Sequence, residues 1–344
     1  MDVPFWIWAL TIVAIVGMLL FDFVGHVRTP HAPSLRESAI WSAVYVGIAI
    51  MFGLLVLWFS GAEFAGEYFA GYVTEKSLSV DNLFVFVLIM ASFGVPRVLQ
   101  QKVLLFGITF ALVLRTVFIL VGAAAIQNFS WVFYLFGAIL LYTAWVQARS
   151  GGHSGDEEYR ENGVLRLVRK VLPTTEEYHS DRMTVRLGGR RFITPLAVAL
   201  IAIGTADVIF AVDSIPAIFG LTQETYLVFA ANAFSLLGLR QLYFLIDGLL
   251  DRLVYLAYGL AVILGFIGAK LVIHALHTNE LPFINGGEHV TAIPEISTGL
   301  SLAVILGTLL VTTVASLAKT RRDRDRAAQD EADVPVLAGE HIPD

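Results

Sequence analysis

Two apolar stretches of the sequence carry the same arrangement: an acid, five residues, an Asp, and then a small amide or hydroxyl residue. Carboxylate, amide and hydroxyl oxygens are the ligands that hard divalent cations accept. An ionisable side chain near the centre of a bilayer costs about 2.5–3.5 kcal/mol, so such acids mark a path for an ion or a proton. The two copies are Glu75, Asp81 and Asn82 in the first stretch and Asp207, Asp213 and Ser214 in the second.

Two arginines lie in the apolar stretches that follow the acid motifs, and a buried charge needs a partner. We expect Arg115 and Arg240 each to balance one acid, which leaves two carboxylates for a divalent cation. Asn232 is a further neutral ligand in this hypothesis. Pro216 either kinks its helix or breaks it and frees carbonyl oxygens beside Asp213. The alternative is that the acids and arginines only lock the helices together.

The surrounding chain is far more apolar than a soluble domain of its length. Of its 344 residues, 57% are hydrophobic and 15% are charged, and the mean hydropathy is +0.73. Runs of about 20 apolar residues can cross a bilayer as helices. We therefore expect an all-α, polytopic membrane protein whose first run is a retained helix rather than a signal peptide. The nine expected helices are 4–21, 38–59, 69–94, 103–126, 131–147, 193–219, 226–246, 253–276 and 298–317.

The two acid motifs indicate an internal duplication. Three expected spans separate them, so the copies cross the membrane in opposite directions, as in the inverted repeats of many secondary transporters. We expect a 3+3 inverted repeat with one shared acidic site near the middle of the membrane. The expected segments are two N-terminal helices at 1–68, the first repeat at 69–147, a cytoplasmic loop at 148–192, the second repeat at 193–277, an outer loop and the last helix at 278–318, and a disordered cytoplasmic tail at 319–344.

The basic residues predict the orientation in the cytoplasmic membrane. Most of them share one side if the N-terminus is outside, so the positive-inside rule gives an outer N-terminus and an inner C-terminus. The outer segments hold only Lys76, unless that residue lies within a helix. Glu63 and Glu67 either form an acidic vestibule there or are solvated surface. The loop at 148–192 should contain a short amphipathic helix at 164–172, and its basic residues either bind anionic lipid or only fix the topology.

Three stretches carry a resemblance to a known family: Glu63–Phe86, Thr205–Gly220 and Asn232–Phe244. In this order they resemble the TerC family of integral membrane proteins, and the resemblance covers nearly the whole chain. It implies membership of the wider LysE-like transporter superfamily and a role in manganese export. The residues alone leave Mn²⁺, Ca²⁺ and Mg²⁺ open. The acidic motif of the family falls here on Glu75, Asp81, Asn82, Asp207, Asp213 and Ser214.

We therefore expect a secondary transporter that exports divalent cations, above all Mn²⁺, with proton exchange as a candidate driving force. It would be no enzyme and would hold no permanent cofactor, and its partners would be membrane lipid and the metal ion, not nucleic acid. The chain contains no cysteine, which excludes disulfides, thiolate metal sites and thiol redox chemistry within it.

Two other functions stay open at this point. The protein could be a membrane scaffold that helps other proteins to acquire metal or to insert, with protein partners bound by the 148–192 loop. A remote alternative is an intramembrane aspartyl protease, which needs two aspartates that share a proton. Tellurium resistance, which the family name suggests, would be an indirect phenotype, because four acids make a poor site for the tellurite anion.

Overall fold

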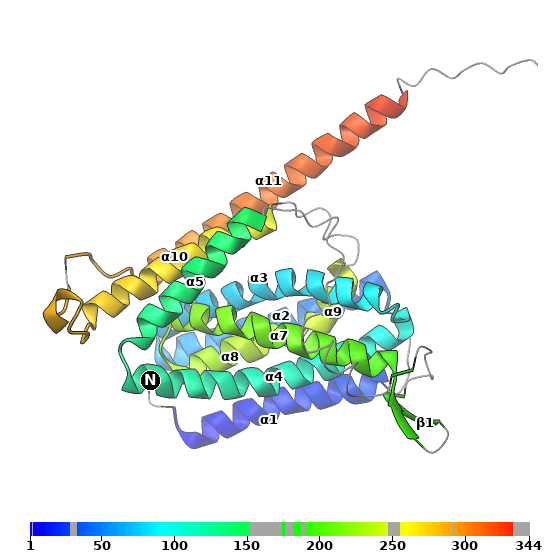
Figure 1. The fold of residues 1–344 in the computed structure, drawn as a ribbon, viewed down its shortest axis with the longest axis horizontal. Helices are drawn as coiled ribbons and strands as arrows, with labels where there is room; N and C mark the ends of the chain where they lie inside the picture. The colour runs from blue at the N-terminus through cyan, green and yellow to red at the C-terminus, as the bar shows by residue number, and fades with distance from the viewer. Residues whose placement is uncertain are drawn as a thin grey trace, which may run out of the picture.

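The structure is a computed structural model that describes residues 1, 3–27, 33–150, 174–175, 182–187, 190–246, 255–290 and 292–332. Nearly all of this part is helical (Figure 1), which confirms the expected all-α membrane fold. The α-helices are α1 (Phe5–Asp22), α2 (Leu35–Ser60), α3 (Ala62–Ser92), α4 (Arg97–Asn128), α5 (Val132–Ser150), α7 (Pro195–Phe219), α8 (Thr225–Leu236), α9 (Leu239–Ile246), α10 (Leu256–His277) and α11 (Thr298–Ala332). A π-helical segment, η1 (Phe23–Val27), continues α1, and a 3₁₀ turn, η3 (Asn285–Gly287), precedes α11.

Eight segments of the described chain are long and apolar enough to cross a membrane. They coincide with α1, α2, α4, α5, α7, α8 together with α9, α10, and the first part of α11. The 31-residue α3 is long enough as well, but its composition is less apolar because it carries five charged side chains. Those five are Glu63, Glu67, Glu75, Lys76 and Asp81.

Local signals in the sequence set several helix ends. Ser34 caps α2, because its hydroxyl accepts a hydrogen bond of 3.2 Å from the backbone N–H of Glu37. Pro195 occupies the first turn of α7, where its missing N–H costs nothing. α4 likewise begins directly after Pro96.

The expected helix at 226–246 is wrong in one respect, because the chain breaks at Leu237 and Gly238 into α8 and α9. Gly238 has a φ of +80°, a left-handed conformation that favours glycine. A Cβ at Gly238 would lie only 2.9 Å from the Cβ of Tyr45, so glycine also allows close approach to α2. The sequence has no proline at this point, so its apolar run predicts one continuous helix.

Two segments outside the bundle add to this picture. The disordered tail expected at 319–344 is helical as far as Ala332, where α11 ends, and 333–344 lie outside the described residues. The loop before α7 contains a short antiparallel hairpin, β1 (Thr184–Leu187) and β2 (Arg190–Ile193), which the sequence does not predict. The amphipathic helix expected at 164–172 lies outside the described residues.

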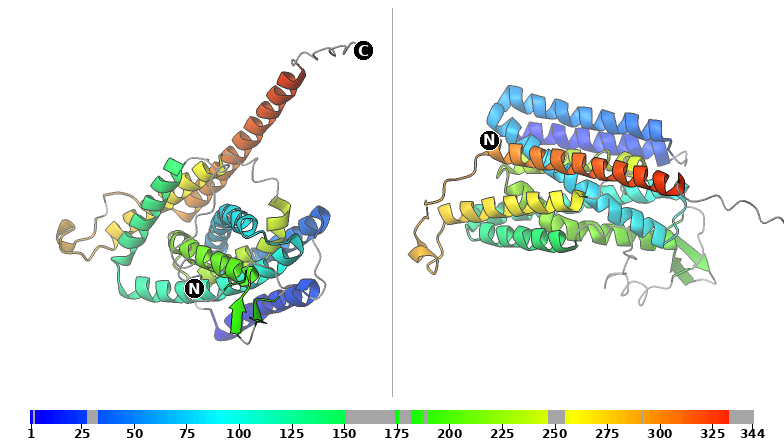
Figure 2. Two further views of the ribbon diagram at one scale, coloured as in Figure 1. Left: turned by 45° about the vertical axis from the view of Figure 1, so that its right-hand side comes forward. Right: turned by 90° about the horizontal axis from the view of Figure 1, so that it is seen from above.

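The helices pack around α3 and α7, which touch each other near the middle of the bundle. α3 also packs against α8, α2 and α11, and α7 packs against α4. In Figure 1, α5, α10 and α11 form one inclined group beside the other helices, and Figure 2 shows the same helices from two further directions. We call the end of the bundle at β1 and β2 the hairpin end. The opposite end, where α3 begins and α7 ends, is called the pocket end.

The α5 and α10 pair is unusually close, because glycines lie at the contact. A Cβ at Gly137 would lie 3.0 Å from the carbonyl oxygen of Gly268. A Cβ at Gly268 would in turn lie 3.1 Å from the backbone nitrogen of Leu141. Small residues allow membrane helices to approach this closely and gain van der Waals contact along their length. We therefore treat α5 and α10 as one packed unit.

Candidate functional site

A buried ion-pair network lies where α3, α4 and α7 meet. Glu75 and Arg115 are completely buried, and Asp207 is 2% exposed. Nε and Nη2 of Arg115 donate to the two carboxylate oxygens of Asp207 at 3.2 and 2.9 Å, which is a bidentate contact. Nη1 donates to Oε1 of Glu75 and, at 3.1 Å, to the hydroxyl of Ser214. The network thus joins residues of both acid motifs around one guanidinium.

The network carries more negative than positive charge. Arg115 faces two carboxylates, and Asp213 lies within electrostatic reach of both Glu75 and Arg115. Asp213 is only partly exposed to solvent. Against Arg115 alone the three ionised acids carry a formal excess of two negative charges, and Lys76 next to Glu75 offsets one of them. Such an excess is what a divalent cation can compensate.

Lys76 is a second cation of the region. It lies inside α3, next to Glu75, which is the helical alternative that the sequence left open. Its Nζ donates to the backbone carbonyl of Ser235 in α8 at 3.0 Å. The two motif helices therefore carry four acids and Lys76, and Arg115 of α4 binds two of these acids, Glu75 and Asp207.

Asp81 lies on a different side of α3 from Glu75. Six residues turn a helix by about 600°, so the two carboxylates point some 120° apart. Asp81 is partly exposed, and its Oδ2 accepts a hydrogen bond of 2.9 Å from Nε2 of Gln147 in α5. Gln147 was not predicted from the sequence, because a single amide near the end of an apolar helix gives no distinguishing signal.

The neutral ligands of the hypothesis are buried but are only partly engaged. Asn82 is 7% and Asn232 is 1% exposed. In the part of the chain that the structure describes, neither amide atom of Asn232 has a hydrogen-bond partner, and the same holds for the hydroxyl of Ser79 in α3. Buried polar groups without a partner are uncommon and often mark a place for water or an ion.

Arg240 does not balance any of the four motif acids, which corrects the prediction. Its Nη2 donates to Oδ1 of Asp22 at 3.1 Å, and Nε2 of Gln241 lies 3.5 Å from the same oxygen. Asp22 ends α1 and is 3% exposed. The break at Gly238 separates α9 from α8, so Arg240 is not carried on a continuation of α8. Asp22 was not predicted from the sequence, although an acid at the end of an apolar run can be recognised there.

Pro216 is buried within α7 and does not end that helix, which continues to Phe219. The predicted helix break is therefore wrong. The missing N–H of Pro216 still removes the usual hydrogen bond to the carbonyl of Val212, next to Asp213.

The described residues contain no group of three or more His, Asp or Glu side chains arranged to hold a metal ion. Of the predicted ligands, Glu75, Asp207 and Ser214 meet at the guanidinium of Arg115, and Asp213 lies near them. Asp81 is hydrogen-bonded to Gln147, away from that network. In this arrangement the guanidinium of Arg115 lies between the carboxylates of Glu75 and Asp207.

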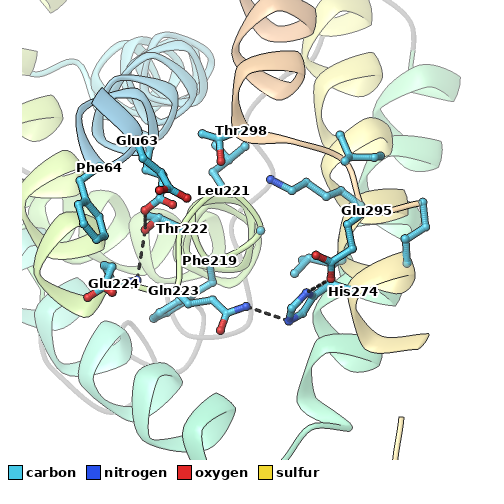
Figure 3. Close-up of a pocket in the computed structure, with 16 residues that line it drawn as sticks. Glu63, Phe64, Phe219, Leu221, Thr222, Gln223, Glu224, His274, Glu295 and Thr298 are labelled. Carbon is cyan, nitrogen blue, oxygen red and sulfur yellow. Dashed lines mark hydrogen bonds and ion pairs between the residues drawn. The ribbon is translucent and has the colours of Figure 1, made fainter. Parts of the chain in front are cut away.

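A cavity of about 380 Å³ opens at the pocket end, between the start of α3, the α7–α8 connection, the end of α10 and the start of α11 (Figure 3). Thr222 donates to Oε2 of Glu67 at 2.6 Å. His274 contacts Glu295 at 3.0 Å and Gln223 at 2.8 Å. Other polar lining residues are Glu63, Glu224 and Lys270. Glu63 and Glu67 thus line a real cavity, as the vestibule alternative required.

The acidic network lies deeper in the bundle than this cavity. Glu67 and Glu75 are both in α3, and eight residues of helix correspond to about 12 Å. Along α7, Asp213 precedes Phe219, which lines the cavity, by six residues or about 9 Å. The cavity and the network therefore follow one another along the same two helices.

Comparison with known proteins shows to which family the chain belongs. The model of the Integral membrane protein TerC family matches residues 60–324, which include both acid motifs, Arg115 and the pocket. The chain belongs to the TerC family. The resemblance carried by the three sequence stretches is thereby confirmed.

Several relatives match nearly the whole chain. An uncharacterized membrane protein of Mycobacterium tuberculosis (strain H37Rv), Rv2723, is 59% identical over 92% of this chain and 80% of its own length. STKORF319 of Myxococcus xanthus is 36% identical over 96% of this chain and 97% of its own length. The protein of Escherichia coli (strain K12) named "Putative membrane-bound redox modulator Alx" is 35% identical over 93% of this chain and 97% of its own length. No solved structure matches the chain.

Proposed function

We propose that this TerC-family protein is a secondary transporter that exports divalent cations, with Mn²⁺ as the favoured substrate. The observation that carries the proposal is the buried network in which Glu75, Asp207 and Ser214, drawn from two similar motifs, surround Arg115. Two acids buried at one guanidinium are costly to keep within a membrane unless they serve an ion or a proton. Their oxygens suit a hard divalent cation.

Arg115 gives the proposal a mechanism. In the ion-free protein its guanidinium compensates Glu75 and Asp207, so the site does not hold bare carboxylates in a medium of low dielectric constant. An entering cation with two positive charges competes for the same oxygens and displaces the arginine. Release of the cation lets Arg115 return. Arg115 thus supplies the positive charge that the two carboxylates need when no substrate is bound. The protein can then change between its inward-facing and outward-facing states without substrate.

The topology proposed from the sequence fits this mechanism. With α3 added to the eight apolar segments, nine spans result, and the basic loops favour an outer N-terminus and an inner C-terminus. Packing supports a 3+3 inverted repeat of 69–147 and 193–277, because α3 packs against α8 as α7 packs against α4, and α5 packs against α10. The pocket end would then face outward and the hairpin end would face the cytoplasm.

In that orientation the charged groups form a route for export through the cytoplasmic membrane. Asp81 lies on the cytoplasmic side of Glu75 along α3, and Asp213 lies on the outer side of Asp207 along α7. The cavity lined by Glu63 and Glu67 would be the outer vestibule. A carboxylate that binds a proton after the metal leaves would couple transport to proton exchange.

The rival functions have less support in the site. An aspartyl protease needs two aspartates that share a proton, whereas both oxygens of Asp207 bind Arg115 and Asp81 binds Gln147. The Escherichia coli relative is named as a redox modulator, but the 344 residues of this chain hold no cysteine for thiol redox chemistry. A scaffold role would depend on the 148–192 loop, and no contact of the described residues favours it.

The decisive experiment is Mn²⁺ flux into or out of proteoliposomes, with Ca²⁺ and Mg²⁺ as competitors. Asp81→Asn and Asp213→Asn should each lose most of the flux, because each removes a charged ligand from the route. Asp22→Asn is the matched control, since Asp22 is also a buried acid but belongs to the Arg240 pair. Normal flux in both motif variants would return these acids to a structural role and favour the scaffold.

A further inference from the structure

A glutamine outside the two acid motifs touches the proposed route. Nε2 of Gln147 donates to Oδ2 of Asp81 at 2.9 Å. Gln147 lies three residues before the end of α5, and the two side chains reach across from α5 to α3. Neither residue is fully buried. The contact therefore lies outside the fully buried network of Arg115.

The position of this contact in the membrane follows from its neighbours. Asp81 is six residues, or about 9 Å of helix, from Glu75 toward the hairpin end. Two residues beyond Gln147, the guanidinium of Arg149 lies 4.4 Å from the ring centroid of the exposed Trp145. Trp and Arg side chains of this kind are typical of the membrane interface. Gln147 and Asp81 thus lie between the proposed cytoplasmic interface and the central network.

A glutamine amide can serve a carboxylate in two ways. Its NH₂ group can donate to a carboxylate, as it does to Asp81, and its carbonyl oxygen is a ligand that hard cations accept. Rotation about the last side-chain bond exchanges the two groups without moving the helix. The same residue can therefore hold an empty carboxylate in place and then contribute an oxygen to a cation that binds to it.

The backbone that carries Gln147 is well supported. α5 packs tightly against α10 through Gly137 and Gly268, and it also contacts α7. The amide is thus presented to Asp81 from a packed helix pair and not from a loop. Ligands on packed elements are held more accurately than ligands on loops.

We propose that Gln147 and Asp81 form the cytoplasmic entry site for the divalent cation, with Gln147 as a neutral oxygen ligand. The inference rests on the proposed transport function and adds a residue and a second binding step to it. The cation first exchanges part of its water shell for the Asp81 carboxylate and the Gln147 amide oxygen. It then moves along α3 to Glu75 and Asp207, where it displaces Arg115.

The test compares three variants of the full-length protein in proteoliposomes, with Mn²⁺ added at the side of the hairpin end. Gln147→Leu removes both the donor and the oxygen and should raise the KM for Mn²⁺ about tenfold, the loss of one ligand contact. Gln147→Glu keeps an oxygen ligand and should hold the KM near the wild-type value or below it. Thr143→Val is the matched control, because the Thr143 hydroxyl bonds to Ile139 of its own helix and not to the acids.

Gln147→Glu shows whether Gln147 is a ligand of the cation or only donates a hydrogen bond to Asp81. If Gln147 only holds Asp81 by its N–H, Gln147→Glu places two carboxylates side by side and should impair transport at least as much as Gln147→Leu. That result, or an unchanged KM in Gln147→Leu, would overturn the inference while leaving the transport function intact. If the wild-type protein carries no Mn²⁺, the proposed function fails first. Equal Mn²⁺ binding by purified wild-type and Gln147→Leu protein would then reject the entry site as well.

Discussion

The two buried arginines of the membrane bundle occupy very different surroundings. Arg115 binds two carboxylates and a hydroxyl from α3 and α7, and a third acid lies within electrostatic reach. Arg240 binds the single carboxylate of Asp22, and within the described chain its Nη1 has no partner. Both side chains are almost inaccessible to solvent. Burial of the guanidinium therefore does not distinguish the two regions, whereas the number of carboxylates bound to it does.

The difference lies in the charge that remains after pairing. Arg240 and Asp22 form a neutral hydrogen-bonded pair that joins α9 to α1, and the partly exposed Glu37 of α2 is the second acid within electrostatic reach of Arg240. Arg115 balances only one of the two buried carboxylates that it binds, Asp213 is a third acid nearby, and Lys76 next to Glu75 offsets part of the excess. Only the second arrangement buries two carboxylates at one guanidinium, and this is the arrangement that we propose for a divalent ion. We therefore expect Mn²⁺ to stabilise variants of the Arg115 region and to have no such effect on variants of the Arg240 region.

The largest effect is expected for Arg115→Met. It leaves Glu75 and Asp207 buried without a cation, and loss of one partner of a buried ion pair costs about 3–5 kcal/mol. Mn²⁺ should restore much of this stability, because the metal takes the place of the arginine. Thermal unfolding of the purified protein with and without Mn²⁺ measures both effects. Rescue no larger than the shift seen in wild type would contradict the displacement mechanism.

Arg240→Met should destabilise the protein by a similar but smaller amount, about 3 kcal/mol, because it leaves a single buried acid. Mn²⁺ should give no extra rescue. The double variant Asp22→Leu with Arg240→Met removes both charges and should recover most of the loss, since apolar replacement of a buried pair is often neutral. A Mn²⁺ rescue of Arg240→Met equal to that of Arg115→Met would remove the distinction between the two regions.

Ser214→Ala tests the neutral part of the network. The variant removes the hydroxyl that accepts from Nη1 of Arg115 at 3.1 Å, and the expected loss is about 1 kcal/mol. Mn²⁺ affinity should fall by less than it does when an acid is removed. Denaturation and Mn²⁺ titration of the same preparation provide both values, with Ser77→Ala as a control whose hydroxyl bonds to the backbone of its own helix.

Asp213→Asn should change the stability of the metal-free protein least, by about 0.5 kcal/mol or less, because Asp213 is partly exposed and forms no ion pair among the described residues. The stabilisation that Mn²⁺ provides should nevertheless decrease. A large loss of metal-free stability would show that Asp213 is a structural residue.

Much of the fold follows from the sequence for simple physical reasons. Long apolar runs predict membrane helices, and the chain indeed folds into eight segments of that kind. The acids of α3 made this helix conspicuous in the sequence and yet lowered its overall apolar character. The break at Gly238 could not be predicted, because it depends on close contact with Tyr45 of a distant helix.

The site was predictable in part. Repetition of the acid motif pointed to Glu75 and Asp207, and the need to pair a buried charge pointed to Arg115. The partner of Arg240 was not predictable, because pairing depends on which helices adjoin, and α9 is not continuous with α8. Gln147 was missed for the same reason: only the packing of α5 brings its amide to Asp81.

The most direct measurement is equilibrium Mn²⁺ binding to the purified protein, followed by electron paramagnetic resonance of the free ion. It should compare wild type, Asp207→Asn and Asp22→Asn, which each alter the acid partner of one buried arginine. We predict binding to the wild type, at least a tenfold loss of affinity in Asp207→Asn and an unchanged affinity in Asp22→Asn. Equal affinities in all three proteins, or no binding to the wild type, would contradict the assignment of the Arg115 network as the cation site.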